Sequence, residues 1–188
     1  MNWGEVSVLV GLIVLNGLFA GSELALVSAR KARLKNRAGQ GHRGAQMALR
    51  LLENPTQLLS TVQIGITLVS ILTGVYSGKA LADDLARVFA GLSWLGEFAE
   101  ETALTLLVIV VTYLSLIVGE LVPKRVALAH AETIAEYVAI TMHWIARVAW
   151  PLVWLLKVST EAATRLMPVS SAPQTSVTED EIRTLVAE

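Results

Sequence analysis

Three long stretches without a single charged residue constrain this chain more than any other feature. They lie between Glu5 and Glu23, between Glu53 and Lys79, and between Glu101 and Glu120. A helix needs roughly 20 mostly apolar residues to cross the hydrocarbon core of a bilayer, with a range of about 17–25. Charged residues make up only 16% of the 188 residues, whereas soluble domains carry about a quarter. We therefore expect an all-α membrane protein with three transmembrane helices, at about 5–27, 56–78 and 102–120.

A fourth apolar region, 132–167, differs from these three because charged residues and a histidine interrupt it at short intervals. It contains Trp144, Trp150 and Trp154, and indoles are enriched at the boundary between lipid and water. Pro151 removes a backbone donor and should break or bend a helix there. We predict an amphipathic interfacial helix, or a bent pair, and a fourth, tilted span is the alternative.

Basic residues predict the orientation. The segment 29–54 carries seven lysines and arginines against the single Glu53, whereas the connection 79–101 is mainly acidic. Lysine and arginine accumulate on the cytoplasmic side of a membrane, so we expect a multi-pass protein of the cell (inner or plasma) membrane, with the N-terminus outside and the C-terminus in the cytoplasm. Helix-forming residues flank GQGHRG in 29–54, which predicts two short juxtamembrane helices joined by a turn. This basic segment would touch anionic lipid, or alternatively a phosphate or nucleotide.

Several function classes are disfavoured by composition. The formal net charge is −1 and there is no cysteine, which leaves no bulk attraction to nucleic acid and no thiolate site or nucleophile. The three histidines (His42, His130 and His143) have no i, i+4 partner among themselves. The sequence also lacks a GxxxxGK[ST] loop for ATP hydrolysis. We expect no enzymatic activity.

Small and hydroxyl-bearing residues in the spans follow helical spacing. The first span offers Asn16, Gly17, Gly21 and Ser22, the second Thr67, Ser70 and Gly74, and the third Thr112, Ser115 and Gly119. Residues at i, i+3 and i+7 share one helix face. Gly17 and Gly21 form a GxxxG pattern, as do Gly74 and Gly78, which allows helices to approach closely. Ordinary hydrogen bonding between helices is the alternative to a binding site.

Glu120 favours a site. It follows Gly119 at the end of the third span, and Pro123 deprives the next turn of a backbone donor, so carbonyl groups at 118–119 are predicted to lack partners. Carbonyls, hydroxyls and one carboxylate form an all-oxygen site that suits a hard cation. Glu23 is a second carboxylate, which could simply pair with a neighbouring lysine or arginine.

Three motifs carry a family resemblance. Residues 19–31 (FAGSELALVSARK), 53–72 (ENPTQLLSTVQIGITLVSIL) and 119–130 (GELVPKRVALAH) resemble the membrane domain of the CorC/cyclin M (CNNM) family. Members of that family are magnesium transporters or magnesium-efflux factors, once described as hemolysins. The resemblance covers nearly the whole chain and implies a homodimer of three-span protomers in the bilayer, with a dehydrated cation site between the spans.

By position, the resemblance assigns the metal site to Ser22, Thr67, Ser70, Gly119 and Glu120. Further candidates are Asn16, Gly21, Glu23 and Ser115, with Pro123 and Lys124 of the GE-x-x-PK motif. Many relatives have asparagines where this chain has Ile66, Thr67 and Ser70, which leaves the ion open. The expected function is export of Mg²⁺ from the cytoplasm coupled to the Na⁺ gradient. A polyamine exporter, and a sensor or scaffold that binds Mg²⁺ without moving it, are the alternatives.

The C-terminal end turns polar after residue 168. We therefore expect residues 1–168 to form the membrane domain and 169–188 to be a linker and the start of a further cytoplasmic domain. Thr178 and Glu181 fit a capping box that opens a new helix. The resemblance implies that paired CBS domains follow, and ATP with Mg²⁺ is expected only there.

Overall fold

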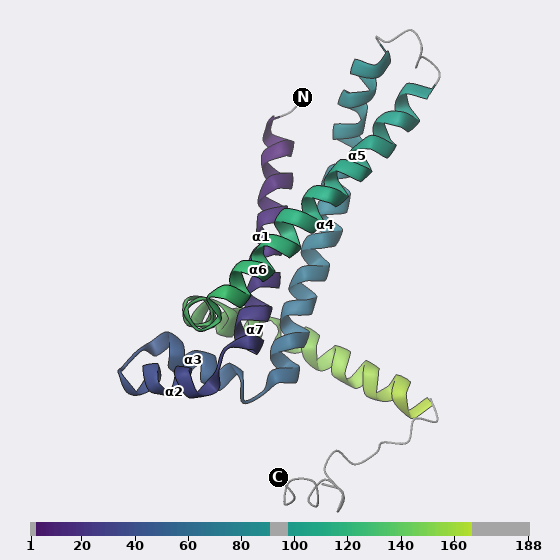
Figure 1. Ribbon diagram of the computed structural model, residues 1–188. Coiled ribbons are helices and arrows are strands. Elements are labelled where there is room, and N and C mark those ends of the chain that lie inside the picture. The colour runs from purple at the N-terminus through teal and green to yellow at the C-terminus, as the bar shows by residue number, and fades with distance from the viewer. Residues whose placement is uncertain (1–2, 91–97, 167–188) are drawn as a thin grey trace, which may run out of the picture. The chain divides into compact units, whose positions relative to one another are not determined.

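The protein is built from helices throughout the residues that the structure describes. The computed structural model describes residues 3–90 and 98–166. Side chains are described for all of these residues except 78–82 and 165–166. The elements are α1 (Trp3–Ser28), α2 (Lys31–Gly39), α3 (Arg43–Leu51), α4 (Pro55–Ala90), α5 (Ala99–Leu116), the π-helical turn η2 (Ile117–Leu121), α6 (Val122–Ala129) and α7 (Ala131–Leu166) (Figure 1). No strand occurs in these described residues, and the all-α prediction is confirmed.

Four helical stretches are long and apolar enough to cross a membrane. They are Trp3–Ser28, Pro55–Ser77, Ala99–Ala129 and Ala131–Thr164. Large apolar side chains on α5, such as Val108 and Ile109, are exposed. Such an exposed apolar surface suits a lipid environment, since monomeric soluble proteins rarely expose large contiguous apolar patches. The chain is therefore a membrane-spanning protein.

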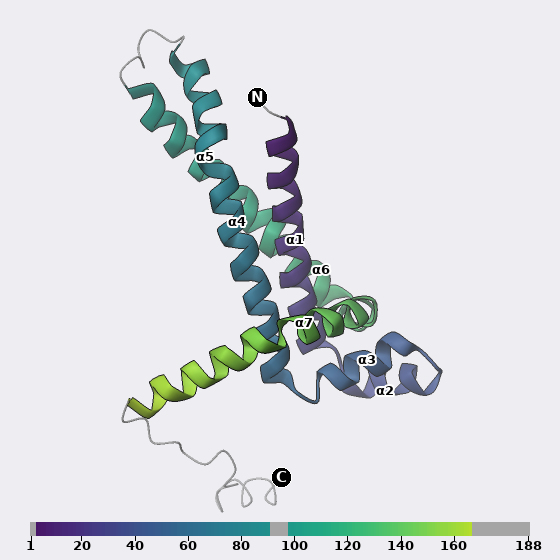
Figure 2. The same ribbon diagram turned by 180° about the vertical axis from the view of Figure 1, so that it is seen from behind.

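The first three long helices pack against one another through small residues. Helix α1 contacts α4, η2 and α6, and α5 contacts α4 (Figures 1 and 2). Pro123 lies so close to α1 that a Cβ on Gly17 would come within 2.7 Å of its ring, and one on Gly21 within 3.3 Å. The predicted close approach at Gly17 and Gly21 is confirmed. A Cβ on Gly74 would instead meet nothing within 4 Å, while the surroundings of Gly78 lie outside the described side chains.

Two helices continue beyond the spans expected for them. Helix α4 continues to Ala90, so the second connection begins later than residue 79. The third helix does not end at 120, because η2 and α6 carry it to Ala129. A π-helical turn adds a residue to the helix. The chain therefore stays helical through Pro123, although this residue has no backbone N–H to donate.

The basic segment folds as predicted into two short helices with a turn between them. Gly41 in this turn has a φ of 92°, a conformation that glycine adopts at little cost. Leu34 of α2 and Ala45 of α3 are fully buried in one cluster with Ala135 of α7. A Cβ on Gly44 would collide with the backbone of Glu136. The helix pair is therefore tightly seated on the first half of α7.

Helix α7 runs from Ala131 to Leu166, so of the break or bend expected at Pro151 the break is absent. One proline removes a single backbone donor, and neighbouring turns keep their hydrogen bonds. Residues 154–166 form a separate helical unit from those up to Val153. The indoles of Trp144, Trp150 and Trp154 are all more than half exposed. This exposure fits the predicted interfacial helix and the alternative of a fourth span equally well, and Ala131–Thr164 is long and apolar enough to cross a membrane. The linker prediction for 169–188, with its capping box at Thr178 and Glu181, lies outside the described residues.

Candidate cation site

The site begins with a local irregularity of the third helix. In η2 the backbone N–H of Val122 donates to the carbonyl of Ile117, five residues earlier. Pro123 follows immediately and has no N–H, so it cannot donate to the carbonyl of Gly119. Single π-helical turns inside α-helices occur frequently at functional sites. Gly119 and Glu120 both lie within this π-helical turn.

The carbonyl of Gly119 finds its partner on another helix. The side-chain Nδ2 of Asn16 on α1 donates to it at 3.1 Å. A Cβ on Gly119 would lie 3.2 Å from the carbonyl oxygen of Ile13, so only a residue as small as glycine lets α1 approach this closely. The prediction that the Gly119 carbonyl lacks a partner was wrong, because Asn16 supplies the donor that Pro123 lacks.

The same amide leaves one oxygen without a partner. Asn16 Oδ1 is buried and accepts no hydrogen bond from any residue that the structure describes. Buried polar atoms are nearly always hydrogen-bonded, so an exception needs an explanation such as a ligand or water. An amide oxygen is also a good ligand for a hard cation.

A cavity of about 440 Å³ lies beside these groups, between α1, α4, α5 and η2. Its lining residues come from all four elements: Ile13, Asn16, Ser70, Thr73, Gly74, Ser77, Val108, Val111, Thr112, Ser115, Leu116 and Glu120. Five of these carry hydroxyl groups. Thr73 donates to the carbonyl of Val69 at 2.8 Å and Ser77 to that of Gly74 at 3.2 Å. No hydrogen bond within the described part of the chain uses the hydroxyls of Ser70, Thr112 and Ser115.

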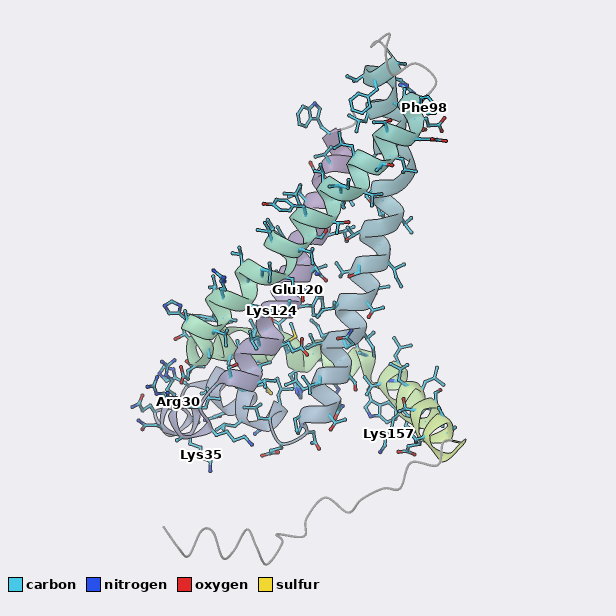
Figure 3. All side chains as sticks on the ribbon, turned by 45° about the vertical axis from the view of Figure 1, so that its right-hand side comes forward. Arg30, Lys35, Phe98, Glu120, Lys124 and Lys157 are labelled. Atoms are coloured by element: carbon cyan, nitrogen blue, oxygen red, sulfur yellow. The ribbon has the colours of Figure 1, made fainter. Side chains whose placement is uncertain are left out.

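Glu120 is the one carboxylate in the lining of this cavity. Its Oε1 accepts a hydrogen bond from Lys124 Nζ at 2.6 Å, and the two side chains are 44% and 36% exposed. Figure 3 shows Glu120 and Lys124 on the third helix. They lie between the end of the helix bundle near Arg30 and Lys35 and the opposite end near Phe98. An ion pair this accessible contributes about 0–1 kcal/mol where water reaches it. A cation that enters the cavity would therefore compete with Lys124 for this carboxylate.

The structure brings together some of the residues expected at the metal site but not others. Ser70, Glu120, Asn16 and Ser115 line the cavity. Ser22 is buried and donates to the carbonyl of Leu18 in its own helix, and Thr67 is exposed. Neither of these two lines the cavity.

The remaining expected residues have other surroundings. Gly21 lies against Pro123, so both serve the contact between α1 and α6. Glu23 is half-buried and makes no ion pair with the residues described here, which leaves the predicted pairing with lysine or arginine without support. Thr73, Ser77 and Thr112 also line the cavity. Thr73 and Ser77 follow Ser70 at i+3 and i+7, so extending the hydroxyl stripe along the second span would have found them.

The donor set determines which metals fit. Within the described residues no three histidines, cysteines or carboxylates come together. Zinc and copper sites rely on imidazole and thiolate, so they do not match. One carboxylate, an amide oxygen and several hydroxyls match a hard cation or a protonated amine.

Comparison with known proteins identifies the family of this chain. The model of the cyclin M transmembrane N-terminal domain matches residues 7–188. The chain belongs to the cyclin M (CNNM) family. The resemblance read from residues 19–31, 53–72 and 119–130 is thereby confirmed.

Bacterial relatives of the domain have several descriptions. A UPF0053 protein of Synechocystis is 50% identical over 175 residues, which are 93% of this chain and 39% of that protein. A polyamine export protein of Haemophilus influenzae is 32% identical over 182 residues, 95% of this chain and 41% of the relative. A UPF0053 inner membrane protein of Escherichia coli is 30% identical over 176 residues, with 93% and 38% covered. None of these three is described as an enzyme.

The cyclin M domain described here thus spans about two fifths of the length of these relatives. It contains the helices that cross the membrane and the cavity between them.

Proposed function

We propose that this cyclin M domain is the membrane part of a cation transporter, with its substrate bound at Glu120 in the cavity between α1, α4 and α5. The observation that supports the proposal is the cavity itself, which is lined by the Glu120 carboxylate and by an amide oxygen that has no partner among the described residues. A pathway through a membrane requires polar groups on facing helices. Polar residues inside a membrane are costly and mark ion or substrate pathways.

Mg²⁺ is the first candidate substrate. It prefers oxygen ligands at about 2.0–2.1 Å in octahedral geometry and usually keeps several waters. The oxygens that line this cavity belong to Glu120, Asn16 and the hydroxyl-bearing residues on α4 and α5. A cavity of about 440 Å³ has room for an ion that keeps part of its water shell, so Ser22 and Thr67 are not needed as ligands.

Export of Mg²⁺ requires an energy source. Membrane voltage contributes about 2.3 kcal/mol per charge per 100 mV, so a divalent ion leaving a negative interior must overcome about 4.6 kcal/mol at that voltage. The chain has no ATP-hydrolysing loop. We therefore propose coupling to Na⁺ entry. In our proposal this end of the bundle faces the cytoplasm, because α2 and α3 carry basic residues and these accumulate on the cytoplasmic side of membranes.

A polyamine is the second candidate, and a specific contact favours it. Glu120 already accepts a primary ammonium, that of Lys124, at 2.6 Å. A polyamine ends in the same group, and the cavity hydroxyls would accept hydrogen bonds from its further amines. Relatives of this chain are described as polyamine export proteins in Haemophilus influenzae and Salmonella typhimurium.

The test measures flux in vesicles that contain the intact protein. Vesicles loaded with Mg²⁺ or with spermidine are compared in the presence and absence of a Na⁺ gradient, for the parent and for Glu120→Gln. The matched control is Glu53→Gln, because Glu53 is an exposed carboxylate outside the cavity. We expect Glu120→Gln alone to lose transport of the true substrate.

The measured fluxes distinguish the two candidate substrates. Flux of Mg²⁺ driven by Na⁺ supports the first candidate, and flux of spermidine alone supports the second. Binding of Mg²⁺ without flux of either solute would replace the transporter with a sensor or scaffold. If Glu120→Gln transports like the parent, the site assignment is wrong.

A further inference from the structure

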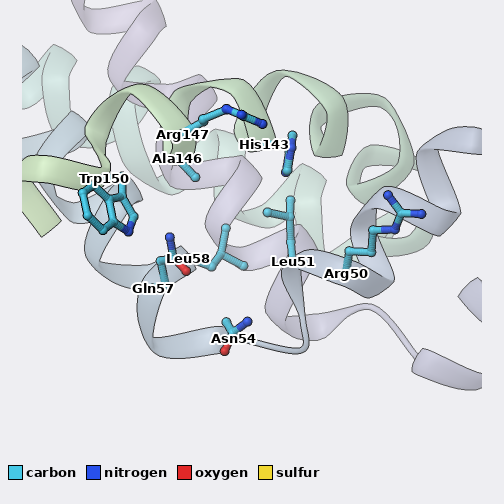
Figure 4. A pocket seen from close by; sticks show the side chains of 9 residues that line it. All are labelled: Arg50, Leu51, Asn54, Gln57, Leu58, His143, Ala146, Arg147 and Trp150. Atoms are coloured by element: carbon cyan, nitrogen blue, oxygen red, sulfur yellow. The ribbon is translucent and has the colours of Figure 1, made fainter. Parts of the chain in front are cut away.

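A second cavity lies where α3 ends and α4 begins, with α7 as its third wall. It measures about 460 Å³ and shares no residue with the cavity at Glu120. The lining residues come from 50–58 and from 143–150 (Figure 4). It therefore lies at the end of the bundle where the second membrane-crossing helix starts.

Two arginines line this cavity without any acidic partner. Arg50 on α3 and Arg147 on α7 make no ion pair within the part of the chain that the structure describes. The arginines of α2 behave differently. Arg33 pairs with Glu132 at 3.4 Å, and Arg37 pairs with Glu136 at 2.7 Å. Both arginines of α2 are therefore paired with a carboxylate, whereas the two arginines at the cavity have no ion pair among the described residues.

The start of α4 adds a positive electrostatic potential to the cavity. Pro55 is the first residue of the helix and the N–H of Leu58 is the first to bond within it, to the carbonyl of Asn54 at 3.2 Å. The N–H groups of Thr56 and Gln57 therefore have no acceptor in the helix itself. The side chains of Asn54 and Gln57 line the cavity and supply amide donors. Helix N-termini attract anions, and phosphates in particular.

The floor of the cavity is apolar. Leu51, Leu58 and Ala146 are at least 91% buried, since their exposed fractions are 9%, 2% and 7%. Trp150 lines the cavity beside them and is 56% exposed. Figure 4 shows Arg147 and His143 on α7 on one side of the leucines, with Arg50 on α3 at another edge. A soluble phosphate would leave this apolar floor in contact with water.

We propose that this cavity binds the headgroup of an anionic phospholipid from the adjacent leaflet of the bilayer. The phosphate would lie between Arg50, Arg147 and the N-terminal end of α4, and the glycerol and upper acyl carbons would cover Leu51 and Leu58. Basic pockets at the ends of transmembrane helices bind such headgroups. The exposed indole of Trp150 suits the boundary between lipid and water, where indoles are enriched. The bound lipid would hold α3 and α7 against the start of α4.

The experiment uses the intact protein, stripped of lipid in detergent and then mixed with phosphatidylglycerol, cardiolipin or phosphatidylcholine. Native mass spectrometry counts the lipids retained by the parent and by the double variant Arg50→Gln/Arg147→Gln. The matched control is Lys35→Gln/Arg43→Gln, which removes two exposed positive charges outside the cavity. A second variant, Arg50→Lys/Arg147→Lys, keeps both charges.

We expect the parent to retain anionic lipid but not phosphatidylcholine. The glutamine variant should bind anionic lipid about thirtyfold more weakly, because each basic residue near an anionic surface contributes about fivefold. The lysine variant and the control pair should stay within about threefold of the parent. Equal losses in the cavity variant and the control, or no loss in either, would overturn the proposal. Displacement of the lipid by millimolar inorganic phosphate would also overturn it, since the cavity would then bind soluble phosphate rather than a lipid headgroup.

Discussion

The hydrogen bond from Asn16 to Gly119 permits a test of how the third helix tolerates Pro123. Asn16→Leu keeps the size of the side chain but removes the only side-chain donor that the structure gives this carbonyl. Hydrogen bonds between transmembrane helices contribute about 0.6 kcal/mol on average and about 1.7 at most. A buried carbonyl left without a partner costs about 1–3 kcal/mol. Because Pro123 cannot replace the lost donor, we expect Asn16→Leu to lower the free energy of unfolding by about 1–2 kcal/mol.

A double-mutant cycle isolates this effect from packing. Pro123→Ala supplies a backbone N–H that can donate to the Gly119 carbonyl, although it also weakens the contact with Gly17. In the Pro123→Ala background, Asn16→Leu should therefore cost about 1 kcal/mol less than in the parent. The two changes are close enough in space for such coupling to be measurable.

The assay is denaturant unfolding of the intact protein in detergent, followed by far-ultraviolet circular dichroism. Asn36→Leu on α2 is the matched control, because it makes the same substitution at an exposed position. If Asn16→Leu and Asn36→Leu lower the free energy of unfolding by the same amount, or if the double-mutant cycle shows no coupling, the reasoning about the missing donor is refuted.

Two further changes test the juxtamembrane packing and the ion pair in the cavity. Gly44→Ala should destabilise the protein by about 1–3 kcal/mol, because its Cβ would strike the backbone of Glu136. Gly39→Ala meets nothing within 4 Å and should be neutral or slightly stabilising in the same unfolding assay. Lys124→Gln should raise the affinity for the transported cation about two- to fivefold in equilibrium binding, since it frees the Glu120 carboxylate from a pair that contributes about 0.2–1 kcal/mol. An unchanged or weaker affinity would show that the lysine does not compete with the substrate.

The sequence predicted only part of the candidate site. Glu120 and Ser70 were predicted and line the cavity, but Ser22 and Thr67 were also predicted and do not. Helical spacing places residues on a common face, yet it does not say which face meets another helix. Asn16 illustrates the difference, because its role depends on a carbonyl 103 residues away.

The number of apolar helices, their approximate positions and the helix–turn–helix of 29–54 follow from local sequence. They are local properties, since hydrocarbon thickness sets the length of a span and each helix satisfies its own backbone. The exact continuation of the third helix through Pro123, the partner of the Gly119 carbonyl and the two cavities are tertiary properties. They depend on how closely α1 approaches the third helix and how α3, α4 and α7 meet. Such contacts between distant residues arise only when the helices pack, so spacing along one helix could not reveal them.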